Sequence, residues 1–301
     1  MKALHRIWHT ALWEWSGAIR SRRALVILLL YLASAVLCMN GSISILGKME
    51  RELAAVLQLP DSEKTGVVSA SLWKSKPFTK IVRATVGEGP VMDDIFGRHP
   101  VELLYAWFAF LCAPLLAVLV CGTRISDDLR SGAVRYMLVR ESRLEWTLGK
   151  YVGQTFMIAV ALAGSSFGAA AVAFIRLSPD VAGGLFLPML GWGMRAWIYS
   201  LAWIGIALGL SHITRSPGRA TSLGILAICI FTAMSPLLGF FHSHFGWPDA
   251  VLQVRMLLPG SAESSLWRFD TVPVLTGGFH LLLLGLVYLM AGVAVFLRRD
   301  V

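Results

Sequence analysis

The stretch that decides the fold joins an apolar segment, LLYAWFAFLCAPLLAVLVC (residues 103–121), to a charged one, RISDDLRSGAVRYMLVRESRLEWTLGKYVG (residues 124–153). The apolar part is long enough to cross a bilayer, which needs about 20 apolar residues for each spanning helix. The charged part carries both signs at helical spacing, and another apolar run follows it. This order predicts a spanning helix that continues into a structured segment outside the membrane.

The composition of the whole chain favours a membrane protein. Apolar residues make up 56% of the 301 residues and charged residues only 15%, whereas soluble domains carry about 25% charged residues. The candidate spans are residues 24–46, 103–121, 151–175, 185–210, 220–241 and 274–297. The first run is longer than the core of a cleaved signal peptide, which has about 7–15 residues. We therefore expect an all-α membrane protein whose residues 24–301 form one domain of six transmembrane helices.

Residues 1–23 precede the first span and carry an amphipathic pattern. The apolar positions that recur at helical spacing are Leu4, Ile7, Trp8, Ala11, Leu12, Trp15 and Ile19. Such a stripe, with cationic residues elsewhere on the helix, is typical of a helix that lies in the membrane interface. We expect an N-terminal interfacial amphipathic helix with a bend near residues 21–23. A helix packed against the protein core is the alternative.

The distribution of Lys and Arg predicts the orientation. If residues 1–23 are cytoplasmic, so are residues 124–150, the turn that contains Arg215 and Arg219, and the C-terminus. These segments carry an excess of basic over acidic residues, while basic and acidic residues are nearly balanced in the remaining loops. The positive-inside rule then places both termini in the cytoplasm, most simply at a bacterial inner membrane. The sequence pI of 9.7 does not indicate nucleic-acid binding, because the basic residues flank spans, where anionic lipids attract them.

Two segments on the other side of the membrane are unusual. Residues 47–101 form a large external insertion in which residues 48–59 look helical and stop at Pro60. Structureless loops of this length are uncommon, so part of the insertion should fold. Its aromatic residues that could anchor it are Trp73, Phe78 and Phe96. The insertion either covers the outer mouth or contacts an external or periplasmic partner.

The second unusual segment, residues 241–273, is interrupted by proline and glycine and is too apolar for a solvated loop. We expect it to form a re-entrant external segment between helices five and six. Its helical fragments would need protein to cover their backbone polar groups within the membrane.

Motifs for nucleotide, metal or hydrolytic chemistry are missing. No Gly-x-x-x-x-Gly-Lys-Ser/Thr loop occurs, so the chain cannot bind ATP in the P-loop manner. The external pair His242 and His244 lacks a third ligand. The cysteines lie within apolar spans and should be small buried apolar residues; they are Cys38, Cys112, Cys121 and Cys229. We expect no catalytic, cofactor-binding or metal site in this chain.

Arg195 is the one charge deep inside an apolar run. A charge at the bilayer centre costs about 2.5–3.5 kcal/mol on insertion scales, so Arg195 should face the bundle or a wet cavity. It is an intramembrane polar residue that either contributes to a substrate path or forms a structural ion pair, with Glu102 as the candidate partner. Small-residue pairs at Gly164/Gly168 and Gly205/Gly209 indicate close helix packing.

The charged segment also carries a family resemblance. Residues 127–132 (DDLRSG), 138–143 (LVRESR) and 149–153 (GKYVG) resemble the cytoplasmic signature of ABC exporter permeases of the ABC-2 type. That signature is an acid followed by Ser-Gly-Thr, a Leu-rich turn, Arg-Pro-x-Ser-Arg, and Gly-Lys-x-x-Gly at the start of the third span. Here Ala133 replaces the Thr and Glu141 replaces the Pro.

Two further stretches fit the same resemblance. Residues 208–220 (LGLSHITRSPGRA) are similar to the family's turn between spans four and five, and residues 257–260 (LLPG) are a weaker match before the last span. The resemblance implies the membrane subunit of an ABC exporter, paired with a second permease chain, most simply as a homodimer. It also implies two copies of a separate ABC ATPase subunit, on which ATP and magnesium would bind. It leaves the substrate open.

In such permeases the loop after the second span docks on the ATPase, so the resemblance assigns residues 124–150 as the coupling segment. The candidate coupling residues are Asp127, Asp128, Leu129, Arg130, Gly132, Leu138, Arg140 and Arg143. A helix over residues 126–143 would align an apolar stripe of Leu129, Val134, Met137 and Leu138, although Gly132 weakens it by about 1 kcal/mol. An amphipathic helix of this kind can dock in a groove of a soluble partner.

Two other functions compete with this one. A membrane scaffold or anchor of an ATPase-linked envelope complex would show the same spans without transport. A secondary transporter would need inverted repeats and more intramembrane ionisable groups, neither of which is visible.

Overall fold

Among the residues that the structure describes, six helices are long and apolar enough to cross a membrane, as expected. The structure is a computed structural model, and it describes residues 2–20, 22–56, 73, 79, 90–245 and 253–298. The six spans lie in α2 (Arg22–Val56), α6 (Pro100–Cys121), α9 (Arg143–Arg176), α11 (Phe186–Ile213), α12 (Pro217–Phe245) and α15 (Thr271–Leu297). The described ranges contain no β-strand, so the all-α fold class is confirmed.

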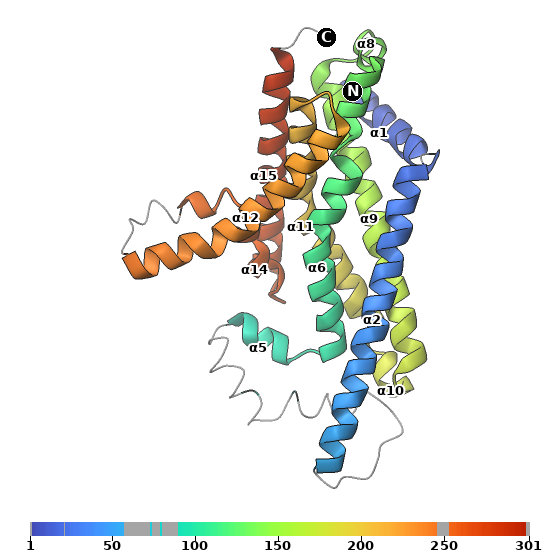
Figure 1. Cartoon of the computed structure of the whole chain (residues 1–301), viewed down its shortest axis with the longest axis vertical. Helices are drawn as coiled ribbons and strands as arrows, with labels where there is room; N and C mark the ends of the chain where they lie inside the picture. The colour runs from blue at the N-terminus through green and yellow to red at the C-terminus, as the bar shows by residue number, and fades with distance from the viewer. Residues whose placement is uncertain are drawn as a thin grey trace.

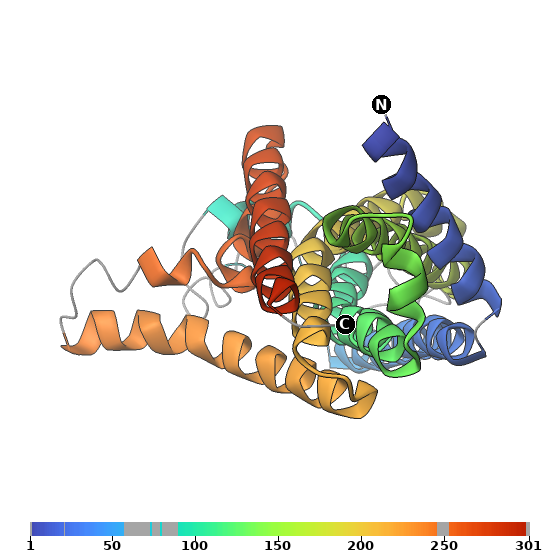
Figure 2. The same cartoon turned by 90° about the horizontal axis from the view of Figure 1, so that it is seen from above.

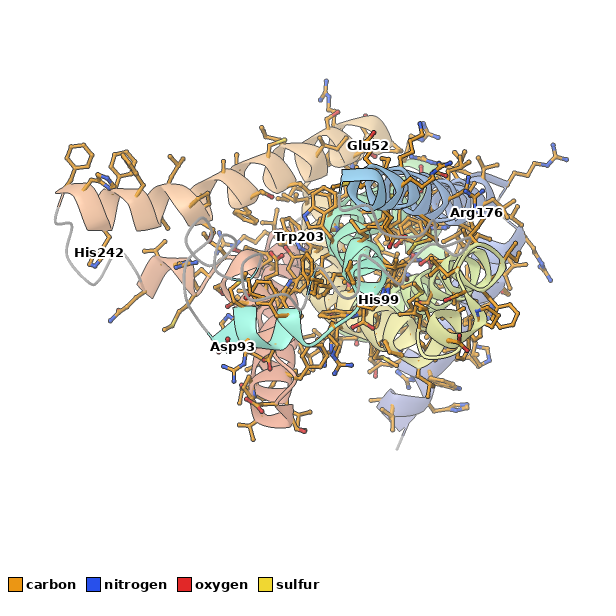
Figure 3. All side chains as sticks on the ribbon, turned by 90° about the horizontal axis from the view of Figure 1, so that it is seen from below. Glu52, Asp93, His99, Arg176, Trp203 and His242 are labelled. Carbon is orange, nitrogen blue, oxygen red and sulfur yellow. The ribbon has the colours of Figure 1, made fainter. Side chains whose placement is uncertain are left out.

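Helix α11 is the centre of the bundle and packs against α15, α6, α9 and α12 (Figure 1). Trp203 of α11 lies inside the bundle, whereas His242 lies at the far end of α12 (Figure 3). Glycine makes the α11–α15 contact possible, because a Cβ on Gly205 would overlap the carbonyl of Gly285 and one on Gly209 would lie 2.5 Å from the carbonyl oxygen of Tyr288. This pair of glycines marks close packing, as predicted, and its partner helix is α15.

The other predicted small-residue pair is only half right. A Cβ on Gly168 would lie 3.0 Å from Cγ2 of Val36 on α2, so this glycine does bring α9 and α2 together. Gly164 has nothing within 4 Å of its missing Cβ. One member of the pair therefore serves packing and the other does not.

Helix α1 (Lys2–Arg20) lies against α9 and α2 at the same end of the bundle as α8 (Ala133–Leu138; Figure 1). Its inward face contains Ala11 and Ala18, both buried. Its outward face is apolar and exposed, and Leu4 on it is 74% exposed. An uncovered apolar face agrees with an interfacial helix, although its depth in a membrane stays a prediction.

At the opposite end, α2 continues without a break from the first span to Val56. The helix predicted over residues 48–59 is therefore an extension of the span, and its predicted end at Pro60 lies outside the described residues. Helix α5 (Pro90–Phe96) precedes α6. The rings of Trp73 and Phe96 are 5.6 Å apart, so two predicted anchors contact each other, while Phe78 is not among the described residues.

Helix α12 leaves the bundle, as the two perpendicular views show (Figure 1, Figure 2). Only 6% of the apolar 18-residue stretch that makes α12 a candidate span is buried; we call such a stretch the apolar window of a helix. Cys229 of α12 is exposed, which corrects the expectation that this cysteine is buried. The chain then returns through the 3₁₀-helix η1 (Pro259–Ser261) and α14 (Glu263–Leu266), which pack against α11 and α15. Short helical pieces are thus present in this segment, and their depth in the membrane stays a prediction.

Candidate coupling site

The segment after the second span folds as a helical hairpin of α7 (Arg124–Ser131) and α8 (Ala133–Leu138). The turn between them is Gly132, which adopts a left-handed conformation at φ 76°. Other L-residues pay about 1–2 kcal/mol in this region, which explains a glycine here. The expectation of one helix over residues 126–143 is therefore wrong, because the helix breaks at Gly132 and α8 ends at Leu138.

Helix α9 begins after the hairpin with a capping box. The backbone N–H of Glu145 donates to Oγ of Ser142 (3.2 Å), and the backbone N–H of Ser142 donates to Oε2 of Glu145 (3.0 Å). Each bond satisfies a donor that the first turn of the helix leaves unpaired. The capping box separates the hairpin from the third span.

The predicted apolar stripe of the hairpin faces inward. Val134 is fully buried, and the partly buried Leu129, Met137 and Leu138 pack against the core. What faces outward is a patch that we call the tip, made of Arg135, Tyr136, Val139 and Arg140. Tyr136 is 82% exposed and Val139 is 85% exposed. The surface free for a partner is therefore next to Leu138 in sequence but on the opposite side of α8.

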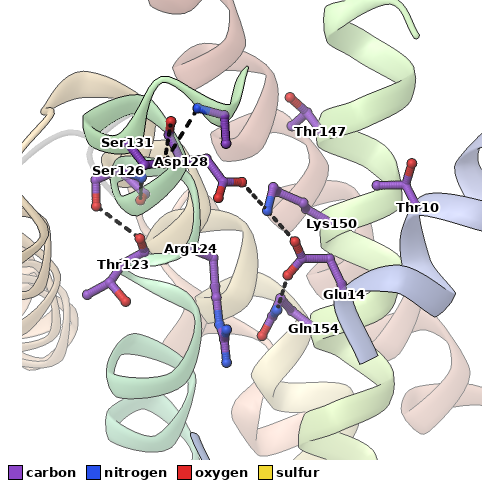
Figure 4. Close-up of polar contacts among 12 residues, drawn as sticks. Thr10, Glu14, Thr123, Arg124, Ser126, Asp128, Ser131, Thr147, Lys150 and Gln154 are labelled. Carbon is purple, nitrogen blue, oxygen red and sulfur yellow. Dashed lines mark hydrogen bonds and ion pairs between the residues drawn. The ribbon is translucent and has the colours of Figure 1, made fainter. Parts of the chain in front are cut away.

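A buried ion cluster holds the hairpin (Figure 4). Lys150 of α9 is 2% exposed and lies between two carboxylates: its Nζ is 2.7 Å from Oδ2 of Asp128 on α7, and it forms an ion pair with Glu14 on α1. Nε2 of Gln154 donates to Oε2 of Glu14 at 3.0 Å. Burial would raise the pKa of Glu14, but the Lys150 ammonium and these hydrogen bonds outweigh it and hold that pKa below its ordinary value.

Glycines of α9 make room for this cluster. A Cβ on Gly149 would lie 2.5 Å from Cβ of Thr10, and one on Gly153 would lie 3.0 Å from the carbonyl oxygen of Ala11. Residues four apart share one helix face, so the two glycines form a groove in which α1 lies, and Lys150 stands beside that groove. The two glycines of the Gly-Lys-x-x-Gly sequence thus form the groove in which the N-terminal helix packs.

Two further bonds join α1 to the start of α9. The hydroxyl of Thr10 donates to Oε2 of Glu141 at 2.6 Å, and Nη1 of Arg6 lies 3.3 Å from Oε2 of Glu145. Glu141 stands where the resembling family has proline, and its carboxylate contacts α1 directly. The N-terminal helix is therefore bound to the linker between α8 and α9 through Glu141, and to the first turn of α9 through Glu145.

The turn after α11 meets the coupling segment as well. The backbone N–H of Ser126 donates to Oγ of Ser211 at 2.9 Å. His212 contacts Thr147, with 3.2 Å between Nε2 and Oγ1, and its Nδ1 lies 2.9 Å from the carbonyl oxygen of Leu208. Because a carbonyl only accepts, Nδ1 of His212 carries a proton and donates it to Leu208. The two stretches that carried the resemblance are thus in contact.

The chain matches, over residues 8–301, the family model described as ABC-2 family transporter protein. It belongs to this family. The match includes most of α1 and all six spans, so the resemblance drawn from residues 127–153 is confirmed. No curated protein matches the chain. As an ABC-2 family member it is a multi-pass membrane subunit of a transporter, and the family implies an ABC ATPase as its partner.

Not all of the predicted coupling residues of this ABC-2 chain face outward. Asp128 is engaged by Lys150. Arg143 donates from Nη1 to the carbonyl oxygen of Phe296 at 2.7 Å, so it caps the end of α15. Arg130 and Arg140 are exposed. Arg130 and Arg140 are therefore available to a partner as exposed charges and Asp127 is half-buried, whereas Asp128 and Arg143 brace the hairpin from within.

Arg195 of the ABC-2 chain connects α11 to α14. Its Nη1 donates to the carbonyl oxygen of Leu266 on α14 at 3.2 Å, and its guanidinium lies 4.4 Å from the ring centre of Phe269. Glu102, the candidate partner from sequence, instead lies 3.8 Å from Arg98. The Arg195–Glu102 ion pair is not formed; the carbonyl of Leu266 takes its place.

Proposed function

We propose that this chain is the permease subunit of an exporter, driven by ATP hydrolysis on two copies of a separate ATPase subunit. The observation that carries the proposal is the tip, an exposed apolar pair of Tyr136 and Val139 between the cations Arg135 and Arg140. The tip lies at the end of the molecule where α1 begins and α15 ends (Figure 1). We assign this end to the cytoplasm, with both termini there, because its segments carry the excess of Lys and Arg.

The chemistry of the tip defines the partner surface. Large exposed apolar side chains flanked by guanidinium groups fit a groove with an apolar floor and an acidic rim. The ATPase would supply this groove, and with it the ATP and magnesium site that the chain's own motifs do not provide. Docking in the groove removes Tyr136 and Val139 from water.

The buried ion cluster gives docking a mechanical consequence. Asp128 belongs to the hairpin, Lys150 to the third span and Glu14 to the N-terminal helix, so a displacement of the hairpin acts on all three elements. Separating a buried ion pair leaves an uncompensated charge and costs about 3–5 kcal/mol. We therefore expect the hairpin, α1 and the start of α9 to move together when the ATPase closes on ATP.

A second permease chain completes the transporter in this proposal. Helix α12 has little of its surface buried, and α2 has only 22% of its apolar window buried. A second copy of the chain that packs on these two helices would enclose a path for the substrate between the copies.

The tip can be tested by co-purification of the cognate ATPase with variants at matched membrane levels. Val139→Asp places a charge in the apolar groove and Arg140→Glu reverses an attraction. Desolvated interface residues contribute about 2 kcal/mol or more, so each variant should bind the ATPase about thirtyfold more weakly. Arg298→Glu, at another exposed cation of the same end, is the control that should bind normally.

Undiminished ATPase binding by both tip variants would contradict the proposal. A scaffold would bind the ATPase but would not couple ATP hydrolysis to movement of a substrate in sealed vesicles, so Val139→Asp would have no transport to uncouple. In an exporter the same variant should abolish ATP-dependent transport.

A further inference from the structure

A small cavity lies where the start of α2 meets the junction of α6 and α7, away from the tip and beside the Lys150 cluster, since Arg124 lines the cavity and also lies near Glu14. Its volume is about 40 Å³. A buried water needs roughly 10–15 Å³ by the same measure, so the space is that of a few waters or one phosphate-sized group. The residues that line it are Arg23, Ala24, Ile27, Leu119, Val120, Thr123, Arg124 and Asp127.

Hydrogen-bond donors from two elements converge on this cavity. Arg23 is an exposed cation at the start of α2, and Arg124 is half-buried at the start of α7. Nε of Arg124 donates to the carbonyl of Val120 at 3.2 Å, while the same guanidinium carries two further NH₂ groups. Paired guanidiniums are the usual protein ligands of a phosphate.

Thr123 provides an independent sign of a ligand. It stands at the N-cap of α7, where a threonine hydroxyl ordinarily accepts a hydrogen bond from the helix, but its side chain makes no capping bond. The residue is only 4% exposed and lines the cavity. Its hydroxyl is therefore available to a group bound inside.

The carboxylate of Asp127 narrows the choice of ligand. A bare phosphate near Arg23 and Arg124 would meet this negative charge, which lines the same cavity. A headgroup that carries both a phosphate and a primary ammonium satisfies both signs. The remaining walls are apolar, with Ala24 and Ile27 on α2 facing Leu119 and Val120 on α6, and they suit the glycerol and acyl region of a lipid.

We propose that this cavity binds the phosphate of a phosphatidylethanolamine headgroup on Arg23, Arg124 and Thr123, with the ammonium of the same headgroup outside the cavity, at its rim, on Asp127. The bound lipid bridges α2 and α7, and so holds the base of the hairpin against the first span. Asp127, a candidate coupling residue from sequence, becomes a lipid ligand, and the inference does not depend on ATPase binding.

The test is native mass spectrometry of the purified full chain, delipidated and then equilibrated with an equimolar mixture of phosphatidylethanolamine, phosphatidylglycerol and phosphatidylcholine of matched acyl chains. We expect one retained phosphatidylethanolamine per chain. Arg23→Gln should lower its occupancy roughly tenfold, the loss expected for a charge-assisted hydrogen bond. Arg22→Gln, the neighbouring exposed cation that does not line the cavity, should leave occupancy unchanged.

Asp127 decides which lipid is retained. Asp127→Asn removes the ammonium acceptor but keeps the cations, so retention should shift from phosphatidylethanolamine to phosphatidylglycerol, while Asp127→Glu keeps the original preference. Soluble phosphoethanolamine, which lacks acyl chains, should not displace the lipid. Equal retention of the three lipids by the unmodified chain, or an unchanged preference in Asp127→Asn with normal thermal stability, would overturn the proposal.

Discussion

Lys150 of α9 lies 2.7 Å from the carboxylate of Asp128 on α7, and both belong to one buried cluster with Glu14 of α1. A single ammonium thus joins the hairpin, the third span and the N-terminal helix (Figure 4). Two carboxylates and one ammonium leave the cluster with a formal charge of −1, which Arg124 offsets from nearby. Its stability therefore depends on the one lysine.

Replacing that lysine should destabilise the protein strongly. Lys150→Met leaves two carboxylates without their cation, and breaking a buried pair costs about 3–5 kcal/mol. We expect a lower thermal unfolding temperature in detergent and a reduced membrane level. The double variant Glu14→Gln/Lys150→Met should recover part of the loss, whereas equal losses in the single and double variants would contradict this account of the cluster.

The lowered pKa of Glu14 predicts a stability change with pH. In the unfolded chain this carboxyl titrates near its ordinary value of 4.5, and in the folded protein it titrates lower. Its contribution is therefore complete above pH 4.5 and is lost as the pH falls through the lowered pKa. Thermal unfolding measured from neutral to acidic pH should show a steeper loss for the unmodified protein than for Glu14→Gln, and parallel curves would rule out this contribution.

The glycine groove predicts that bulk on α9 will release α1. Gly149→Leu places a side chain where Thr10 and the backbone of Ile7 already lie, so α1 should leave its groove while the spans persist. A cysteine at the buried position Ala11 should then react with a water-soluble maleimide at least tenfold faster, since burial no longer protects it. Gly164→Leu, on the same helix but with open space around it, should leave that reactivity unchanged.

The exposed face of α12 predicts a contact between copies of the chain. Cys229 lies on this face, and the nearby exposed positions Leu226 and Ile230 offer a cysteine scan in a Cys229→Ser background. If a second copy packs there, mild oxidation should produce disulfide-linked dimers at one or two of these positions in the membrane. The interface would lie elsewhere if no position of α12 gave cross-links while exposed positions of α15, such as Phe279, did.

Most of the fold could be predicted because a bilayer demands long apolar runs, and such runs are directly visible in a sequence. The break at Gly132 was foreseeable as a weak point, since glycine disfavours helix. The side of α8 that faces outward could not be foreseen. Leu138 and Val139 are adjacent and both apolar, and only the packing of α8 decides which of them is exposed.

The buried cluster escaped prediction for a different reason. Glu14 and Lys150 are 136 residues apart, and no periodic pattern links a carboxylate in an N-terminal helix to a lysine near the start of the third span. The Gly149-x-x-x-Gly153 spacing was the available signal, because it marks a face that another helix can approach closely. Likewise, hydropathy could not distinguish α12 from its neighbours: its value of 2.1 equals that of α9, yet 6% of the α12 window is buried against 44% for α9.

The central position of α11 has a consequence for biogenesis. Its window has the lowest mean hydropathy of the six, 1.4, and the largest buried share, 78%, and it contains Arg195. The translocon recognises spans by their own apolarity, so this helix is the weakest substrate for independent insertion, while its main packing partner, α15, is synthesised last. We therefore expect ribosome-bound chains that end before α15 to hold α11 only loosely in the membrane, and the final helix to complete its insertion.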